Sequence, residues 1–443
     1  MNKREFLQAS GALLTGGALS HLTAADSRTN WSGNYRYSTD QLHVPSSVEE
    51  LRKVVKSCSK LKALGTCHSF NAIADSKENQ VSLKAFNEMT LDAKGRTVTV
   101  GAGIKYGQLA PYLDSHGFAL HNLASLPHIS VAGARSTATH GSGIKNGNLS
   151  TVVSGLELMT ADGEIVSLSR ERDGSRFEGA VVDLGGMGVV TKLTLDVQPT
   201  FAVRQMVYEN LSFDQLEKNL DEIFSSGYSV SLFTDWQQHR ATQVWIKSRV
   251  EPGHTVQFKP EFFGAKRATR KLHPLAGHSA ENCTEQMGIP GPWYERLPHF
   301  RMNFTPSSGA ELQSEYFVAR DQAYRAILAV EKLREHVSPH LFITELRTIA
   351  ADELWMSPCY KRASLAIHFT WKPEWPAVKT VLPMIEEQLA PFNARPHWAK
   401  LFTMDSARLR GFYEKLPDYK ALAGNYDPKG KFRNEFLTSK LYA

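Results

Sequence analysis

Two neighbouring segments in the last third of the chain carry polar residues at a spacing of two, which places them on one face of a β-strand. The first segment carries Glu345 and Arg347, and the second carries His368 and Thr370. A carboxylate, a guanidinium, an imidazole and a hydroxyl side by side form a floor of hydrogen-bonding groups. A solvent-facing ion pair on a surface strand gives the same spacing, so both interpretations stay open at this point.

Two glycine-rich stretches upstream have the composition of a phosphate cradle. In 125–147 glycine frees the backbone to turn, and serine and threonine hydroxyls lie next to exposed N–H groups, so this stretch can wrap a pyrophosphate. A shorter glycine turn, 64–71, carries His68 at the end of an apolar run. A plain surface loop has a similar composition, and it is the second stretch that favours a binding site.

Hydrophobic patterning indicates the elements that position these residues. Strands are predicted over 341–349 and 364–371, and amphipathic helices over 321–337 and 376–389 cover them. In the earlier half, one helix is predicted after a cap at Ser46 or Ser47, and another through Leu109 and Leu113. Strands are predicted over 61–64, 97–100 and 189–197. A hairpin is predicted in which 156–159 pairs with 165–168 around the turn Asp162-Gly163. Gln198-Pro199-Thr200 marks a boundary between two parts of the chain.

The motif Gly101-Ala-Gly-Ile-Lys-Tyr-Gly107 follows a predicted strand and therefore invites comparison with a Rossmann fingerprint. Its spacing is G-x-G-x-x-x-G, and no acidic residue lies about twenty positions on, where the ribose partner belongs. Both departures argue against a nicotinamide site.

Five motifs together resemble the alditol oxidases, within the vanillyl-alcohol-oxidase or p-cresol-methylhydroxylase type of FAD-binding proteins. They are Gly-Thr-Cys-His-Ser-Phe-Asn (65–71), Ala-Ser-Leu-Pro-His-Ile-Ser-Val-Ala-Gly (124–133), Glu-Leu-Arg (345–347), His-Phe-Thr-Trp (368–371) and Arg-Pro-His-Trp-Ala-Lys (395–400). The resemblance runs from Asn30 to the C-terminus. It implies an α+β fold, with a two-subdomain FAD-binding domain over 30–199, a substrate domain over 200–398 whose antiparallel sheet is covered by helices, and a C-terminal segment, 399–443, that returns to the FAD domain.

The resemblance also implies roles for the polar floor. Glu345 accepts hydrogen bonds from substrate hydroxyls, and Arg347 and His368 hold the C1 and C2 hydroxyls. Thr370 and Ser125 complete the substrate sleeve. Hydride passes from C1 of the substrate to flavin N5, and Lys400 near flavin N1 stabilises the charge that the reduced ring gains.

For the cofactor, the resemblance implies FAD joined covalently through His68. A second, cysteinyl attachment is not expected, because the relatives that have one carry cysteine before the proline, where this chain has Leu126. The other residues expected at the cofactor are Gly65, Thr66, Cys67, Ser69, Phe70, Asn71, Ser125, Ser130, Gly133, Ala134, Arg135, Ser136, Thr137, Thr139, His140 and Val190. Arg135 departs from the family pattern and offers a phosphate partner.

The expected reaction is oxidation of the C1 hydroxyl of alditols such as xylitol or sorbitol to the aldose, with oxygen reduced to hydrogen peroxide. An aldonolactone enzyme that passes electrons to another acceptor, or a sugar-binding protein without chemistry, remain as alternatives. A net charge of +6 without long runs of like charge gives no support to nucleic-acid binding. The spacing of the four cysteines fits no metal site, so we expect no metal, and we expect a monomer.

The first 25 residues have the layout of an export signal. Lys3-Arg4 before Phe6-Leu7 is similar to a twin-arginine pattern, and a weakly apolar stretch ends in small residues at Thr23-Ala24-Ala25. The apolar stretch is too short to span a membrane. The sequence therefore predicts export in the folded, FAD-loaded state, with a cytoplasmic protein as the alternative.

Overall fold

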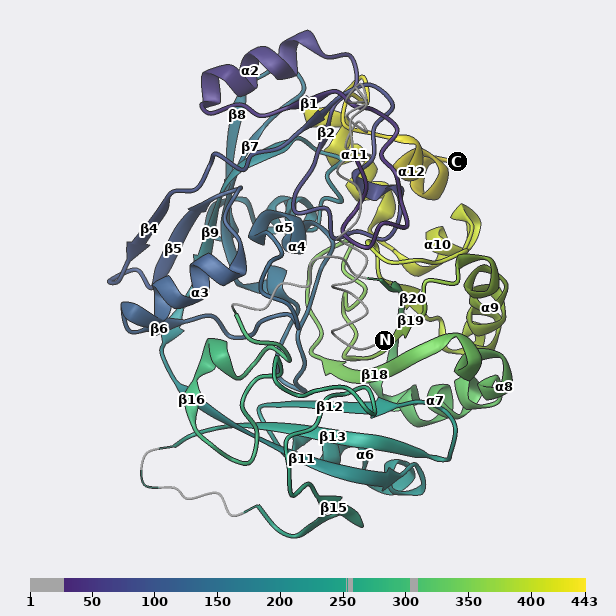
Figure 1. The fold of residues 1–443 in the computed structure, drawn as a ribbon. Helices are drawn as coiled ribbons and strands as arrows, with labels where there is room; N and C mark the ends of the chain where they lie inside the picture. The colour runs from purple at the N-terminus through teal and green to yellow at the C-terminus, as the bar shows by residue number, and fades with distance from the viewer. Residues whose placement is uncertain (1–27, 252, 254–257, 303–309) are drawn as a thin grey trace, which may run out of the picture.

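The computed structural model describes residues 28–251, 253, 258–302 and 310–443, so the predicted export signal lies outside the described residues. Figure 1 shows two groups of strands, with the purple and blue N-terminal elements and the yellow C-terminal helices at one end and the teal and green strands at the other. Helices and antiparallel sheets are mixed along the chain, which confirms the predicted α+β class.

The N-terminal group contains an antiparallel five-stranded sheet in the order β4-β5-β9-β7-β8. Its strands are β4 Met89–Asp92, β5 Thr97–Gly101, β7 Val153–Met159, β8 Ile165–Ser169 and β9 Val189–Asp196. A parallel three-stranded sheet lies beside it, made of β1 Leu42–His43, β2 Lys62–Ala63 and β3 Gln80–Val81, and a pair joins β6 Phe118–Ala119 to β10 Gln198–Pro199. The predicted hairpin is confirmed, since β7 pairs antiparallel with β8.

The second group is one ten-stranded sheet in the order β14-β15-β11-β13-β12-β18-β19-β17-β20, with β16 beside β11. Its strands are β11 Ala202–Ser212, β12 Ser229–Thr234, β13 Arg240–Arg249, β14 Glu261–Phe262, β15 Ala265–Arg267, β16 Gly291–Pro292, β17 Leu312–Ala319, β18 Leu341–Ile349, β19 Ser364–Trp371 and β20 Arg395–Pro396. The bounds of β18 and β19 are those predicted from the alternation of polar and apolar residues.

The helices pack on these sheets. In the N-terminal group they are α2 Val48–Ser57, α3 Tyr106–Ser115, α4 Val131–Ser136 and α5 Arg170–Val181, with the 3-10 turns Ala72–Ala74 and Leu149–Val152. The later helices are α6 Asp214–Ser225, α7 Ala323–Glu331, α8 Arg334–Val337, α9 Trp375–Gln388, α10 Ser406–Phe412, α11 Leu416–Tyr426 and α12 Glu435–Leu437; short helical turns lie at Trp293–Glu295, Arg320–Gln322, Ser338–His340, Ala390–Phe392 and Thr438–Tyr442.

Local chemistry explains where these helices begin and end. The Ser47 hydroxyl accepts from the Glu50 N–H, and the Glu50 carboxylate accepts from the Ser46 N–H, so α2 begins at a capped N-terminus as predicted. The single helix predicted over 321–337 is wrong in detail: a 3-10 turn, α7 and α8 share this stretch, and the chain leaves the α-helix at Lys332–Leu333. Apolar side chains still cover β17 and β19 from α7.

The C-terminal segment lies against the N-terminal group. Lys431 donates to the carbonyl oxygens of Val55 and Ala161, and the Asn434 side chain donates to three carbonyls in 72–75. The polypeptide thus leaves the N-terminal sheets at residue 199, builds the ten-stranded sheet, and comes back. This path brings the glycine-rich stretches close to β17, β18 and β19.

Candidate active site

A cleft lies where the glycine-rich stretches meet the ten-stranded sheet. It contains about 1150 Å³ of empty space, part of it open to solvent. One side is formed by 62–74, 124–140 and 184–185, and the other by residues of β17, β18, β19 and the segment 397–400. Both of the stretches that the sequence analysis singled out therefore face the polar floor.

Strand register brings the polar side chains together. Glu345 on β18 is directly opposite His368 on β19, which is directly opposite Glu315 on β17. Directly opposed residues project from the same face of a sheet, so these three side chains and Arg347 share one face. Glu345 and Arg347 are each only 5% exposed. The pair is therefore buried in the cleft, and the alternative of a solvent-facing surface pair is wrong.

Glu315 joins the cations of the cleft to one another. Its carboxylate lies 2.7 Å from Lys400 Nζ, 3.0 Å from Arg347 Nη2 and 3.2 Å from His140 Nε2. Burial alone raises the pKa of such a carboxyl, but Lys400, His140, His368 and Arg347 together hold the pKa of Glu315 well below its usual range. It is therefore an ionised, fully buried carboxylate that keeps two cations in place.

His368 has a defined tautomer. Its Nδ1 lies 2.7 Å from Lys400 Nζ and its Nε2 lies 3.2 Å from the Thr370 hydroxyl. Because an ammonium group only donates, Nδ1 accepts and Nε2 carries the proton. Burial and the charge of Lys400 lower the pKa of His368 to about 4, so the imidazole is neutral at neutral pH. Burial likewise lowers the pKa of Lys400, although Glu315 opposes that shift.

His68 lies on the opposite side of the cleft within an aromatic group. Its Nδ1 is 3.1 Å from His128 Nε2, and its ring centroid is 4.5 Å from that of Trp31. Burial, reinforced by the positive charge of Lys400 and the neighbouring His128, lowers the pKa of His68 to about 3. The imidazole is therefore neutral, which leaves a ring nitrogen with a lone pair.

The Ser130 side chain leaves little room for a Cβ at two nearby glycines. A Cβ on either Gly65 or Gly133 would lie 2.8 Å from the Ser130 hydroxyl, closer than side-chain carbons come to such atoms. That hydroxyl accepts from the Gly133 N–H, and the Ser130 N–H donates to Thr66. The two glycine stretches therefore touch and form a narrow cradle lined by hydroxyls and backbone.

Comparison with known proteins places the chain among flavoproteins. A family model described as an FAD binding domain matches residues 39–169, and one described as D-arabinono-1,4-lactone oxidase matches residues 310–440. An alditol oxidase of Streptomyces sp. (strain IKD472 / FERM P-14339) is 48% identical over 422 residues, which is 93% of this chain and 98% of that protein. The chain belongs to the alditol oxidase family.

More distant relatives agree with this placement. An L-gulonolactone oxidase of Mus musculus is 26% identical over 93% of this chain and 98% of its own length. A crystal structure of cholesterol oxidase from B. sterolicum superposes with a TM-score of 0.76 at 14% identity, covering 93% of this chain and 96% of that one. The fold is thus that of the vanillyl-alcohol-oxidase type of FAD-binding proteins, as predicted.

The residues that line the cleft of this alditol oxidase family member fit FAD. The cleft is large, the cradle at Ser130 is lined by glycines and hydrogen-bonding groups, and a neutral histidine and a buried lysine both line the cleft. Such groups suit a pyrophosphate and a flavin ring that accepts charge. FAD is the cofactor of this protein. Among the residues that the structure describes, no group of histidine, cysteine and acidic side chains is arranged to hold a metal ion.

Most of the expected site residues line the cleft. The lining includes Gly65, Thr66, Cys67, His68, Ser69, Ser125, Ser130, Gly133, Ala134, Ser136, Thr137, Thr139, His140, Glu345, Arg347, His368 and Lys400. Four others lie behind it. Phe70 packs edge-on against His68, and Asn71 donates to the carbonyls of Trp398 and Lys400. Val190 lies in the core, and the Thr370 hydroxyl contacts Nε2 of His368, which itself lines the cleft.

Arg135 differs from the expectation. Its guanidinium is buried, contacts Asp183 at 3.0 Å, and donates to the carbonyls of Ala180 and Val181. These partners occupy both terminal nitrogens of the guanidinium, which a phosphate would need for a two-pronged contact. Arg135 therefore ties α4 to the end of α5 and is not a phosphate ligand in this structure.

Several residues of the site were missed from the sequence. They are Glu315, Gln313 and His397 in the cleft lining, and His299 with Lys247 behind Glu345. One sequence feature could have pointed to Glu315, because it is the one charged residue in the stretch 312–319. No sequence pattern pointed to His299, since it lies in a segment with little regular structure.

Proposed function

We propose that this protein oxidises the C1 hydroxyl of alditols such as xylitol or sorbitol to the aldose, with oxygen reduced to hydrogen peroxide. FAD, when bound, supplies the hydride acceptor of this reaction. The observation that carries the proposal is the buried floor of Glu345, Arg347 and His368 at one end of the FAD cleft. Membership of the alditol oxidase family supports it.

The floor matches a substrate that presents several hydroxyls. Arg347 donates, and the ionised Glu345 accepts through Oε2, which has no hydrogen-bond partner among the described residues. Since buried hydroxyls need both donors and acceptors, a polyol can satisfy this set. Ser125, 3.4 Å from Arg347 Nη1, extends the polar surface from the other side of the cleft.

In this proposal Lys400 stabilises charge near the reacting carbon, and His368 orients the hydroxyl on that carbon. Lys400 is a buried cation whose position is fixed by Glu315 and by His368 Nδ1. In this proposal it stabilises negative charge that develops beside it when C1 is oxidised. In this proposal the His368 Nε2–H is shared between the Thr370 hydroxyl, 3.2 Å away, and the C1 hydroxyl, which it orients. Burial of the floor excludes bulk water from the reacting atoms.

His68 is the proposed covalent attachment point for FAD. It lines the cleft, is held neutral by burial, and has His128 and Trp31 to fix its ring. Denaturing the purified protein in acid tests this attachment. Flavin that stays with the precipitate is expected, and flavin released entirely into the supernatant would contradict it.

Two further features belong to the proposal. Residues 1–25 are proposed to direct export by the twin-arginine route, and a fusion of these residues to a reporter tests this, because a reporter that stays cytoplasmic would reject it. No helix in the described part of the chain is long and apolar enough to cross a membrane. The protein is proposed to act as a monomer, which light scattering checks.

The activity is tested by peroxide release with a panel of substrates. Xylitol and sorbitol are compared with L-gulono-1,4-lactone, because lactone oxidases are among the relatives. Peroxide formed with the polyols and little with the lactone is the expected result. Turnover of the lactone alone would move the assignment to a lactone oxidase.

A further inference from the structure

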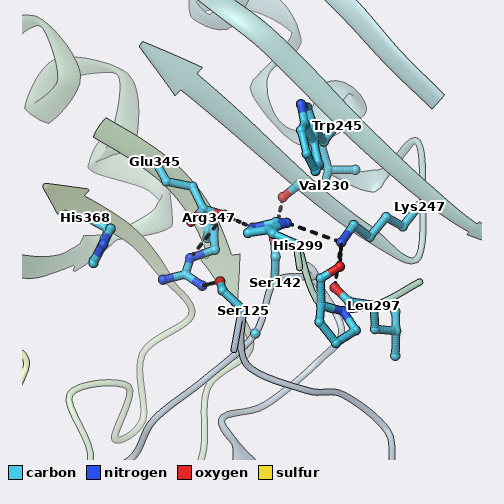
Figure 2. A network of polar contacts seen from close by, with 12 residues as sticks. Ser125, Ser142, Val230, Trp245, Lys247, Leu297, His299, Glu345, Arg347 and His368 are labelled. Carbon is cyan, nitrogen blue, oxygen red and sulfur yellow. Dashed lines mark hydrogen bonds and ion pairs between the residues drawn. The ribbon is translucent and has the colours of Figure 1, made fainter. Parts of the chain in front are cut away.

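A buried chain of polar groups runs away from Glu345 into the larger sheet (Figure 2). His299 Nε2 lies 2.7 Å from Glu345 Oε1, and His299 Nδ1 lies 3.3 Å from Lys247 Nζ. Lys247 belongs to β13, and its Nζ also lies 2.6 Å from the carbonyl oxygen of Leu297 and 2.9 Å from that of Pro298. Neither His299 nor Lys247 has been given a role in the reaction so far.

The donors and acceptors in this series of hydrogen bonds determine which nitrogen of His299 carries the proton. Burial lowers the pKa of Lys247 to about 7, so below that pH the group is an ammonium. An ammonium group has three hydrogens and accepts none, so it donates to two carbonyls and to His299 Nδ1. Nδ1 is therefore the bare nitrogen, and the proton of the neutral imidazole is on Nε2. This N–H faces the Glu345 carboxylate, which accepts it.

The surroundings hold the His299 ring in this orientation. The ring packs edge-on against Phe233 and Trp245, with centroid distances of 5.5 and 5.3 Å. Phe233 is also directly opposite Glu345 in the β12–β18 register, so the strand that carries the aromatic wall is hydrogen-bonded to the strand that carries the carboxylate. Rotation of the ring would break both hydrogen bonds at once.

We propose that His299 is a positioning residue for substrate binding: Lys247 fixes its tautomer, and its Nε2–H holds Oε1 of Glu345 so that Oε2 faces the substrate. This inference rests on the proposed function, because it assigns Glu345 to the polyol. It makes Glu345 a hydrogen-bond acceptor that remains ionised during the reaction.

The charged and titratable groups around Glu345 support this ionised state. Arg347 is on the same strand, His299 and Lys247 approach from behind, His368 is across the strand pair, and Lys400 and Glu315 lie on the cleft side. Burial raises the pKa of Glu345, but Arg347 and His299 outweigh it and hold the pKa well below its ordinary value. Removing His299 therefore raises the pKa of Glu345.

Three variants of the holoenzyme test the positioning role. His299→Leu removes the donor, His299→Gln restores a donor to Glu345 and an acceptor for Lys247, and Lys247→Met leaves the tautomer unfixed. We expect His299→Leu to raise KM for xylitol at least about tenfold, the size of one lost hydrogen bond to a charged group, with a smaller change in kcat. His299→Gln should recover most of the loss, and Lys247→Met should lie between them.

Two further readouts separate positioning from general damage. The acidic limb of the kcat/KM profile should move to higher pH in His299→Leu, because a Glu345 with a raised pKa is protonated sooner. His273→Gln is the matched control, since the His273 ring stacks on His278 and its Nδ1 accepts from the Leu275 N–H, so its hydrogen bond does not involve Glu345 or Lys247. It should leave KM within about twofold, a change small on the scale of a hydrogen bond.

NMR of protein labelled with ¹⁵N-histidine tests the tautomer without turnover. The signal that disappears in His299→Gln should show a bare Nδ1 and a protonated Nε2 in the wild-type protein. A protonated Nδ1, or an unchanged KM and pH profile in His299→Leu, would overturn the proposal. If His299→Leu does not fold, His299→Gln and the wild-type spectrum still decide it. Lack of polyol turnover by the wild type would contradict the proposed function, and the spectrum would then decide the tautomer on its own.

Discussion

Replacing Glu315 with glutamine removes one negative charge from the centre of the cleft and keeps the shape of the side chain. Lys400 and Arg347 would then be buried cations without their shared partner, 2.7 and 3.0 Å away in the wild type. Breaking a buried ion pair from one side costs about 3–5 kcal/mol of folding free energy. The unfolding entropy of about 2.1 cal/mol/K per residue gives roughly 0.9 kcal/mol/K for a chain of this length. We therefore expect Tm to fall by about 3–5 °C if the chain unfolds as one unit.

The pH dependence of this difference provides a second readout. Because the folded-state pKa of Glu315 is held below its ordinary value, its stabilising contribution is complete above the unfolded pKa of about 4.3 and is lost as pH falls through the folded value. The gap in Tm between wild type and Glu315→Gln should therefore stay constant from about pH 8 to about pH 5 and shrink in more acidic buffers. Differential scanning calorimetry measures both quantities.

Glu386→Gln is the control for this experiment. Glu386 is also buried, but its carboxylate accepts from the neutral Tyr316 hydroxyl and from Thr403. A glutamine can keep most of these bonds, so the expected loss is about 1 kcal/mol. If Glu315→Gln changes Tm no more than this control does, Glu315 does not hold the two cations in place and the electrostatic account of the cleft is wrong.

Three other substitutions address separate parts of the site. Lys400→Met should slow flavin reduction by polyol by orders of magnitude in stopped-flow measurements, and an unchanged rate would reject its role in stabilising charge. His68→Ala should leave no flavin in the acid precipitate, whereas retained flavin would mean attachment at another residue. Arg135→Met leaves Asp183 buried without its partner and should lower stability by about 3–5 kcal/mol. Its FAD content at saturating FAD should be unchanged, and a specific loss of FAD binding would restore the phosphate role to Arg135.

Local patterns in the sequence were enough to find the floor of the site. The alternation of polar and apolar residues over 341–349 and 364–371 gave both strands, and their antiparallel pairing then placed Glu345 beside His368. The pairing of β7 with β8 was likewise encoded by a local turn, Asp162-Gly163. Each of these features depends on residues close together in the chain.

The features of the site that could not be predicted depend on contacts between residues far apart in the sequence. Glu315 reaches His368 only because β17 pairs with β19, and nothing in the sequence of β17 specifies that partner. His299 and Lys247 meet through the packing of a loop on β13. Arg135 next to a glycine stretch is compatible with a phosphate or with Asp183, and only the fold decides between them. Helix α5 escaped notice because its sequence is largely polar and Gly174 interrupts it with a positive φ of 47°.

The central claim is that the buried floor presents a polyol to FAD, and anaerobic mixing tests it most directly. Purified protein is mixed with xylitol and then with sorbitol in the absence of oxygen, the flavin absorption is followed, and air is admitted afterwards. The account predicts bleaching by a polyol and rapid return of the colour with formation of peroxide. Flavin that stays oxidised with both polyols but bleaches with a sugar lactone would contradict the assigned roles of Glu345 and Arg347.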